Sequence, residues 1–215
     1  MRRILWLLPL LVLVPFARSA DNEPPRGFTS LLNGKDLEGW KVMGGKKDVW
    51  GFEKGALHVS GGGGGWLLTE KEYDDFELMF ECKMPRKGNS GVALRTPDSG
   101  DPAYVGMEIQ LLDDETWMKE EKLRPEQFTG AIYDVVAPSK NVSKPHGEWN
   151  SMKITCKGPK VTVELNGEKV VDANLDDYKE KHGKKHPGLL RTKGHVGFQS
   201  YNFRVEYKNI FIKPL

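Results

Sequence analysis

The side chains with the clearest chemical potential lie in a polar stretch of predicted strand, residues 105–112. Strand alternation places Glu108 and Gln110 on one face of that strand and apolar residues on the other. Tyr133 and Trp149 follow downstream and can supply aromatic rings to the same site. A carboxylate beside an amide, close to aromatic rings, suits a concave sugar site, because rings cover the apolar faces of a sugar and polar groups bind its hydroxyls.

Short alternating segments must position these residues, because helical periodicity is nearly absent from the sequence. Gly, Pro, Asn and Asp separate the segments, which is typical of a β-sandwich or barrel. The pattern predicts one all-β domain over residues 20–215, with a short surface helix near residues 116–127. The expected strands cover residues 28–32, 48–53, 56–60, 66–69, 75–84, 90–95, 105–112, 130–134, 149–156, 160–165, 168–171, 194–199 and 204–213.

Two glycine-containing segments are predicted to be turns. Asn166-Gly167 indicates a two-residue hairpin, because both turn positions require positive φ. The run from Gly61 to Gly65 lacks the Lys-Ser/Thr pair of a phosphate-binding loop, and a strand rather than a helix follows it. A turn at the rim of the sandwich is therefore expected there.

The N-terminus predicts export. Residues 1–19 combine a positive start, an apolar run from Ile4 to Phe16 and the small-x-small sequence Ala17-Arg18-Ser19, which are the parts of a signal peptide. The mature chain would begin at Ala20, in the periplasm or outside the cell, with no membrane contact after cleavage. An uncleaved anchor is the alternative, although the run is shorter than the ~20 apolar residues of a membrane span.

Charge gives no sign of a nucleic-acid partner. The full chain has a formal net charge of +2, and removal of residues 1–19 takes away three arginines and no acidic residue, which leaves −1. The one basic run, residues 181–193, lies in a predicted loop that contains Pro and Gly. The histidines around it are expected to be solvated, and no pattern specifies an oligomeric state.

Cofactor signals are absent from the sequence. Cys82 and Cys156 fall on the apolar faces of their strands, so two buried free thiols are expected, with a disulfide as the alternative that export allows. Neither cysteine has a histidine at the spacing of a zinc site. No cofactor is evident, and a divalent cation near Glu108 and Asp113 or Asp114 stays open.

A series of motifs appears in the order and spacing of one known family. They are residues 28–40 (FTSLLNGKDLEGW), 75–78 (DFEL), 88–92 (GNSGV), Arg95, 106–113, 129–133 (TGAIY), 147–150 (GEWN), 165–167 (LNG), 197–199 (GFQ) and 205–212 (VEYKNIFI). On these motifs the chain resembles the 3-keto-disaccharide hydrolase family, over essentially the whole predicted mature chain. The resemblance implies a concanavalin A-like jelly roll of two antiparallel sheets with ligands on the concave face. It also implies cleavage of glycosides already oxidised at carbon 3 of the sugar.

That chemistry requires a general base and a group that stabilises an enolate. A ketone at C3 acidifies the hydrogen on C2, so removal of that proton allows the C1 substituent to leave by elimination, and addition of water completes a net hydrolysis. Glu108 is the predicted base, and Arg95 is the predicted catalytic cation, because small residues precede it on its face of the strand. The predicted substrate-binding residues are Ser90, Gln110, Tyr133, Trp149, Asn150 and Gln199.

Ordinary structural roles are the alternatives for these residues, such as an ion pair for Arg95 and core packing for the aromatic rings. One position also departs from the family pattern. Related sequences often carry His-Gly two residues after the final glutamine, Gln199, where this chain has Tyr201-Asn202. If that histidine acts chemically, the departure implies an altered substrate or lost activity.

Two other functions stay open. Retaining β-glucanases of the same fold, such as laminarinase-like enzymes, use a bulged strand of the form Glu-x-Asp-x-x-Glu. Here Glu108, Gln110 and Asp113 have that spacing, and one bulge would bring Asp113 to the face of Glu108. A non-catalytic, lectin-like carbohydrate-binding module is the other alternative, because a fold does not fix a function.

Overall fold

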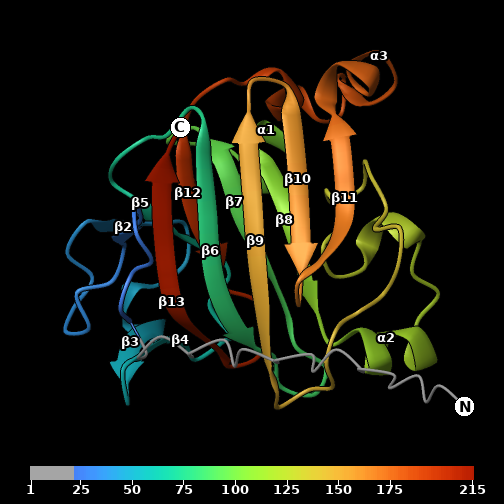
Figure 1. Ribbon diagram of the computed structural model, residues 1–215. Helices are drawn as coiled ribbons and strands as arrows, with labels where there is room; N and C mark the ends of the chain where they lie inside the picture. The colour runs from blue at the N-terminus through green and yellow to red at the C-terminus, as the bar shows by residue number, and fades with distance from the viewer. Residues whose placement is uncertain (1–21) are drawn as a thin grey trace, which may run out of the picture.

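A computed structural model describes residues 22–215, and in it two antiparallel sheets stack face to face (Figure 1). The predicted signal peptide, residues 1–19, lies outside the described residues. The larger sheet contains, in spatial order, β11 (Glu168–Asn174), β10 (Lys160–Leu165), β9 (Trp149–Lys157), β6 (Phe76–Lys83), β13 (Val205–Pro214), β4 (Ala56–Val59) and β3 (Trp50–Glu53), with β1 (Thr29–Ser30) beside β13. The smaller sheet contains β2 (Trp40–Met43), β5 (Trp66–Thr69), β12 (His195–Gln199), β7 (Asn89–Thr96) and β8 (Met107–Leu112).

The predicted all-β sandwich is therefore confirmed, and the core lies between its two layers. Alternation in β6 buries every second side chain, from Phe76 to Cys82, against the inward faces of β12 and β7. Phe198 of β12 packs edge-on against Phe80, with 5.3 Å between the ring centroids. Both cysteines are buried and free, and burial raises the pKa of each thiol to about 12.

Helices occupy the connections between strands. The predicted surface helix is present as α2 (Asp114–Glu120), which begins and ends earlier than expected, because residues 121–124 are extended before Pro125 starts a short 3-10 turn. The other helical segments are α1 (Pro102–Val105), α3 (Lys179–His182), η1 (Lys47–Val49), η2 (Pro125–Gln127), η3 (Leu175–Asp177) and η4 (Pro187–Leu190). Within residues 22–215 no helix is both long enough and apolar enough to cross a bilayer.

Local turn chemistry was predicted well, with one exception. Asn166 and Gly167 join β10 to β11 with φ of 53° and 83°, as the hairpin requires. The strand predicted over residues 130–134 is wrong, because Gly130 (φ 89°) and Asp134 (φ 62°) turn the chain at both of its ends. The short edge strand β2 carries too little alternation to have been predicted.

Candidate active site

The outer face of the five-stranded sheet carries Glu108 and Gln110, as strand alternation predicted. In the register of β7 and β8, Glu108 lies opposite Ala93, and Gln110 lies opposite Gly91. A Cβ atom on Gly91 would collide with the Glu108 carboxylate, so this carboxylate lies over the glycine backbone. The small residues of β7 therefore create the space that Glu108 occupies.

A cavity of about 170 Å³, here called the Glu108 pocket, opens above this part of the sheet. Four of the predicted site residues line it: Glu108, Gln110, Tyr133 and Gln199. Its remaining walls come from Asn89, Asp101, Ala103, Tyr104 and Tyr201. The pocket thus combines two carboxylates, three amides and three phenols, which are groups that can bind and protonate the oxygen atoms of a sugar.

Backbone hydrogen bonds hold Tyr133 beside Glu108. The Tyr133 amide donates to the Glu108 carbonyl (2.8 Å), and the Gln110 amide donates to the Ala131 carbonyl (3.0 Å). The segment lies along β8 in this way although it is not a regular strand. On another wall of the pocket, the Asp101 carboxylate accepts from the amide of Ala103 (3.1 Å) and caps α1.

Asp134 holds in place the part of the pocket wall that contains Tyr104 and Tyr133. Its buried carboxylate accepts hydrogen bonds from Arg124 and Lys185, and His186 lies 3.3 Å from it. Burial alone would raise the pKa of the Asp134 carboxyl, but these three hydrogen bonds outweigh it and lower that pKa to about 2. The His186 ring also packs on Tyr104, at 5.0 Å between centroids.

His186 and His195 are therefore not solvated, in contrast to the expectation from the sequence: each has 3% or less of its surface exposed. No local sequence pattern indicates the burial of these two histidines, because the carboxylates that hold them lie far away along the chain. His186 contacts Asp134, and His195 contacts Asp98.

Glu108 differs from Asp134 in having no partner. Only 4% of the residue surface is exposed, and no described residue forms a hydrogen bond or ion pair with its carboxylate. Burial, together with repulsion from Asp101, raises the pKa of the Glu108 carboxyl to about 8. Gln110 is held by a hydrogen bond from the Leu111 amide to its side-chain oxygen (3.1 Å). The Gln110 amide nitrogen is thus left to donate toward the pocket.

Arg95 does not line the pocket. It has φ of 51°, and Leu94 and Arg95 together face the single residue Val196 of β12, so a bulge breaks the alternation that predicted its direction. The guanidinium is 1% exposed and lies where β7 ends, turned away from the pocket toward residues that flank β6 and β9 of the larger sheet. It donates to the Asp75 carboxylate (3.1 Å) and to the carbonyls of Asp74 (3.0 Å), Gly158 (2.8 Å) and Arg191 (3.3 Å).

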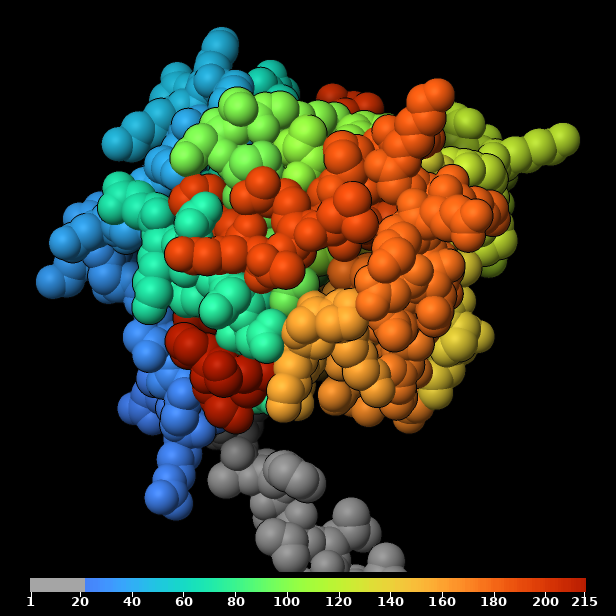
Figure 2. Space-filling view, turned by 90° about the horizontal axis from the view of Figure 1, so that it is seen from above, coloured from blue at the N-terminus to red at the C-terminus, as the bar shows by residue number. Residues whose placement is uncertain are grey.

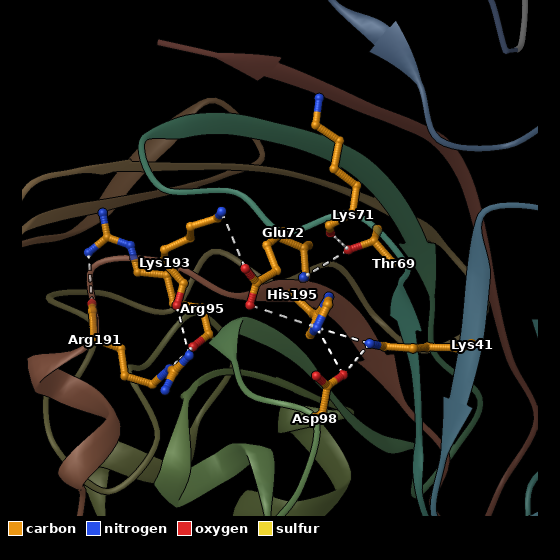
Figure 3. A network of polar contacts seen from close by, with 10 residues as sticks. Lys41, Thr69, Lys71, Glu72, Arg95, Asp98, Arg191, Lys193 and His195 are labelled. Carbon is orange, nitrogen blue, oxygen red and sulfur yellow. Dashed lines mark hydrogen bonds and ion pairs between the residues drawn. The ribbon is translucent and has the colours of Figure 1, made fainter.

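A second polar group adjoins Arg95 at that end of the sheet (Figure 3). The His195 Nε2 atom lies 2.9 Å from the Lys41 ammonium and 3.2 Å from the Asp98 carboxylate, and Glu72 pairs with Lys193 at 3.4 Å. Figure 2 looks down on this end, where the orange segment near residues 184–194 lies between the teal and green segments near residues 72 and 100. Charges of both signs are therefore paired here.

The other predicted binding residues lie away from the pocket. Ser90 faces the core, where its hydroxyl shares a hydrogen bond with Tyr207 (2.6 Å) and donates to the Gln199 carbonyl (2.8 Å). Trp149 is on the other sheet, with the ammonium groups of Lys83 and Lys208 over its ring at 4.9 and 4.8 Å.

Asn150, next along β9, also has a structural environment. Its side-chain oxygen accepts hydrogen bonds from the Lys144 amide (2.8 Å) and the Asn166 side chain (2.8 Å). These bonds tie the loop before β9 to the β10–β11 hairpin.

Asp113 is not brought to the Glu108 face. The β7–β8 register is unbroken from Asn89 to Leu94, so the bulge that a glucanase site needs is absent from this strand pair. Asp113 instead accepts from the Lys87 amide (2.8 Å) and lies 3.6 Å from His146. Across residues 22–215, no cluster of three or more His, Cys, Asp or Glu side chains is arranged to hold a metal ion.

Five pocket residues were missed by the sequence reasoning: Asn89, Asp101, Ala103, Tyr104 and Tyr201. An Asp-Pro pair is a common helix start, so Asp101-Pro102 could have indicated α1 and with it Tyr104. Tyr201 stands where the family resemblance led us to expect a histidine, and it lines the pocket.

Comparisons with known proteins agree with this architecture. Residues 27–213 match the family described as the 3-keto-alpha-glucoside-1,2-lyase-like domain. A 3-keto-disaccharide hydrolase of Bacteroides thetaiotaomicron is 28% identical over 172 residues, which cover 69% of this chain and 59% of that protein. The match thus spans less than two thirds of that curated relative.

Solved structures share the fold. A provisionally assigned glycosyl hydrolase from Parabacteroides distasonis superposes with a TM-score of 0.81 at 31% identity, covering 91% of this chain and all of that one. The carbohydrate-binding module CBM66 from Bacillus subtilis superposes with a TM-score of 0.57 at 14% identity, covering 84% and 97%, and shows the fold alone. The match over residues 27–213 and the first of these structures establish the family: the chain belongs to the 3-keto-alpha-glucoside-1,2-lyase-like domains.

Proposed function

We propose that this protein cleaves glycosides whose sugar ring carries a ketone at C3, and that the oxidised ring binds in the Glu108 pocket. The observation that carries the proposal is the buried, unpartnered carboxylate of Glu108 in a pocket of amides and phenols. Membership of the family supports the substrate class, and the named relative from Bacteroides thetaiotaomicron acts on 3-keto-disaccharides by its description.

The reaction path begins at C2 of the oxidised ring. Glu108 in its ionised form takes the C2 proton, and the electron pair moves into an enolate whose negative charge rests on the C3 oxygen. Re-formation of the C3 ketone then expels the C1 oxygen substituent, which takes the proton from Glu108 and leaves as the alcohol, and a C1–C2 double bond remains. Water adds its hydroxyl to C1 and a proton to C2, so the net result is hydrolysis.

The raised pKa of Glu108 suits a base for this step. A carboxylate of ordinary pKa is weakly basic, whereas one with a pKa of about 8 is a stronger base that is still partly ionised near neutral pH. Burial causes both the basicity and the low ionised fraction, because an unpaired charge is poorly solvated in the pocket.

The enolate oxygen needs hydrogen-bond donors, and Arg95 is bonded elsewhere. The Gln110 amide and the hydroxyls of Tyr104 and Tyr133 line the same pocket and can donate. These neutral donors line a wall that Asp134 and its bonded partners hold in place before the reaction. They would therefore stabilise the developing charge without rearrangement. Burial raises the pKa of the Tyr104 hydroxyl, with a further contribution from Tyr133, so Tyr104 stays a donor at neutral pH.

A substrate panel tests the proposal. Purified protein is incubated with 3-keto-trehalose, methyl 3-keto-glucoside and the unoxidised parent sugars. Cleavage of the keto forms alone supports the proposed function. Binding of the keto forms without turnover, or cleavage of the parent sugars, contradicts it in favour of a lectin-like module or an ordinary glycosidase.

Isotope labelling tests the path separately. In heavy water, early product should carry deuterium at C2, because hydration re-protonates that carbon. Free 3-keto product incubated without enzyme must stay unlabelled over the same time. Product without deuterium at C2 would rule out elimination followed by hydration.

We also propose that the protein is exported, on the evidence of residues 1–19. N-terminal sequencing of protein recovered from the periplasm or medium should begin at Ala20 or Asp21. Recovery only from the cytosol with Met1 intact would contradict export.

A further inference from the structure

A second cavity adjoins the Glu108 pocket on the same outer face of the small sheet. It encloses about 370 Å³ and shares Asp101, Gln199 and Tyr201 with the Glu108 pocket. Gly44, Gly64 and other glycines form much of its wall, so it is called the glycine cavity here. A ligand in one cavity can therefore extend past the three shared residues into the other.

Close backbone packing explains the glycines in this wall. A Cβ atom on Gly45 would collide with the Gly64 carbonyl, and one on Gly65 would collide with the backbone of Gly44. The turns before and after this contact have positive φ, which glycine adopts without strain. Gly44, Gly64 and Gly65 thus build a wall of main chain, which leaves room that side chains would otherwise fill.

An aromatic side chain faces this space from the sheet. Trp66 lines the glycine cavity and belongs to a small apolar cluster with Leu68 and Ala93, separate from the main core between the sheets. Met43 packs against this cluster and lines the cavity as well. An apolar floor of this kind suits the C–H face of a sugar ring.

The polar groups of the glycine cavity indicate a neutral ligand. Ser200 lines the cavity, and its buried hydroxyl has no hydrogen-bond partner within residues 22–215. Gln199 and Tyr201 on either side of it add an amide and a phenol to the lining, and both groups can bind the hydroxyls of a sugar. Asp101 is the one charged side chain in the described lining, and its negative charge disfavours anionic ligands.

We propose that the glycine cavity binds the leaving group of the substrate, as a neutral second sugar ring. The inference rests on the proposed function, since it assigns the oxidised ring to the Glu108 pocket. The shared residues Asp101, Gln199 and Tyr201 then lie beside the bond that is cleaved. Main-chain walls around the glycine cavity make the enzyme selective for a disaccharide over a glycoside with a small leaving group.

Two asparagine variants of the glycine run test this subsite. A side chain added at Gly64 or at Gly62 would meet no atom within 4 Å, and both glycines have positive φ, which Asn tolerates better than most residues. Gly64 lines the glycine cavity and Gly62 does not, so Gly62→Asn is the matched control. Gly64→Asn should lower kcat/KM for 3-keto-trehalose by roughly tenfold or more, as expected when a pocket loses its fit. Its effect on methyl 3-keto-glucoside should be much smaller, and Gly62→Asn should change neither substrate.

Equal losses on both substrates, or no loss on 3-keto-trehalose, would overturn the subsite. A phosphate on the leaving sugar should reduce cleavage by the wild type, and equal cleavage would overturn the assignment to a neutral ring. If the wild type cleaves neither keto substrate, the proposed function fails, and calorimetric binding of 3-keto-trehalose still decides the subsite. Weaker binding by Gly64→Asn alone supports it, whereas equal binding by both variants and the wild type overturns it.

Discussion

Two neighbouring strands of the five-stranded sheet, β7 and β8, bury opposite charges in opposite ways. On β7, Arg95 is surrounded by the Asp75 carboxylate and three carbonyl oxygens, so each part of its guanidinium is used. On β8, Glu108 is almost as buried but has no hydrogen-bond or ion-pair partner among the described residues. The first arrangement stabilises the fold, and the second reduces stability to keep a group chemically available.

This difference separates structural from functional burial better than residue type does. Arg95 and Glu108 both belong to motifs of the same family, and they lie on neighbouring strands, Arg95 on β7 and Glu108 on β8. A satisfied charge has its geometry and its pKa fixed by the protein, whereas an unsatisfied one is completed by a ligand. The five predictions that follow test the distinction, in order of decreasing expected effect.

Glu108→Gln should have the largest effect on activity. The substitution keeps the size of the side chain and removes its ability to accept a proton, so kcat on a 3-keto-glycoside should fall by roughly 10²–10⁴-fold. Binding of the substrate should change much less, as measured by calorimetry. Near-normal turnover in folded Glu108→Gln protein would show that the unpartnered carboxylate is not the base.

The pH dependence of the wild type sharpens this test. If Glu108 acts as a base, kcat/KM should rise by nearly tenfold per pH unit from about pH 6 and level off above about pH 8, near the pKa of its carboxyl. A fall in kcat/KM above pH 8 would instead assign Glu108 the role of a proton donor.

Arg95→Met should have the largest effect on stability. Removal of the guanidinium leaves three carbonyls without this donor and leaves the Asp75 carboxylate with the Gly158 amide but no cation, which should lower the free energy of unfolding by roughly 3–5 kcal/mol. Urea denaturation at pH 7 measures this loss, with Arg191→Met as a comparison at a neighbouring, more exposed guanidinium. If folded Arg95→Met protein lost turnover by 100-fold without losing stability, the comparison between the two buried charges would be wrong.

Stability of the wild type should fall as the pH rises from 5 to 8. Glu108 has a pKa of about 8 in the folded protein against an ordinary value near 4.5, so between these values the unfolded chain has already released the proton that the folded chain retains. The contribution of this group is therefore fully present below pH 4.5 and declines by up to about 4 kcal/mol between pH 5 and 8.

Glu108→Gln is the control for that measurement, because it removes the titration and leaves the other groups in place. When both proteins are denatured across pH 5–8, the free energy of unfolding of the variant should increase relative to that of the wild type as the pH rises. Parallel curves would mean that Glu108 is ionised in the folded state.

Trp149→Ala should have the smallest effect. Trp149 lies on the eight-stranded sheet with two ammonium groups over its ring, away from the Glu108 pocket, so kcat and KM should change by less than about twofold. A loss of stability of about 1 kcal/mol is expected from the lost cation–π contacts. A tenfold rise in KM would mean that the eight-stranded sheet also contacts the sugar, and the site would then not be confined to the five-stranded sheet.

Several features of the protein were determined by the sequence alone. Alternation and turn residues predicted the sandwich, the Asn166-Gly167 hairpin and the common face of Glu108 and Gln110, because these depend on periodicity and local φ preferences. The ordered motifs also indicated the family, which the match over residues 27–213 establishes.

The tertiary structure decided the rest of the candidate site. Sequence distance gave no means of knowing that Arg95 turns away at a bulge, or that Trp149 and Asn150 belong to the other sheet. The meeting of Asp101 and Tyr201 with Glu108 likewise depends on how β12 pairs with β7 and where α1 folds over the sheet. Alternation fixes only the face toward which a side chain points. The pairing of distant strands and the satisfaction of buried charges decide which side chains meet and which stay free for chemistry.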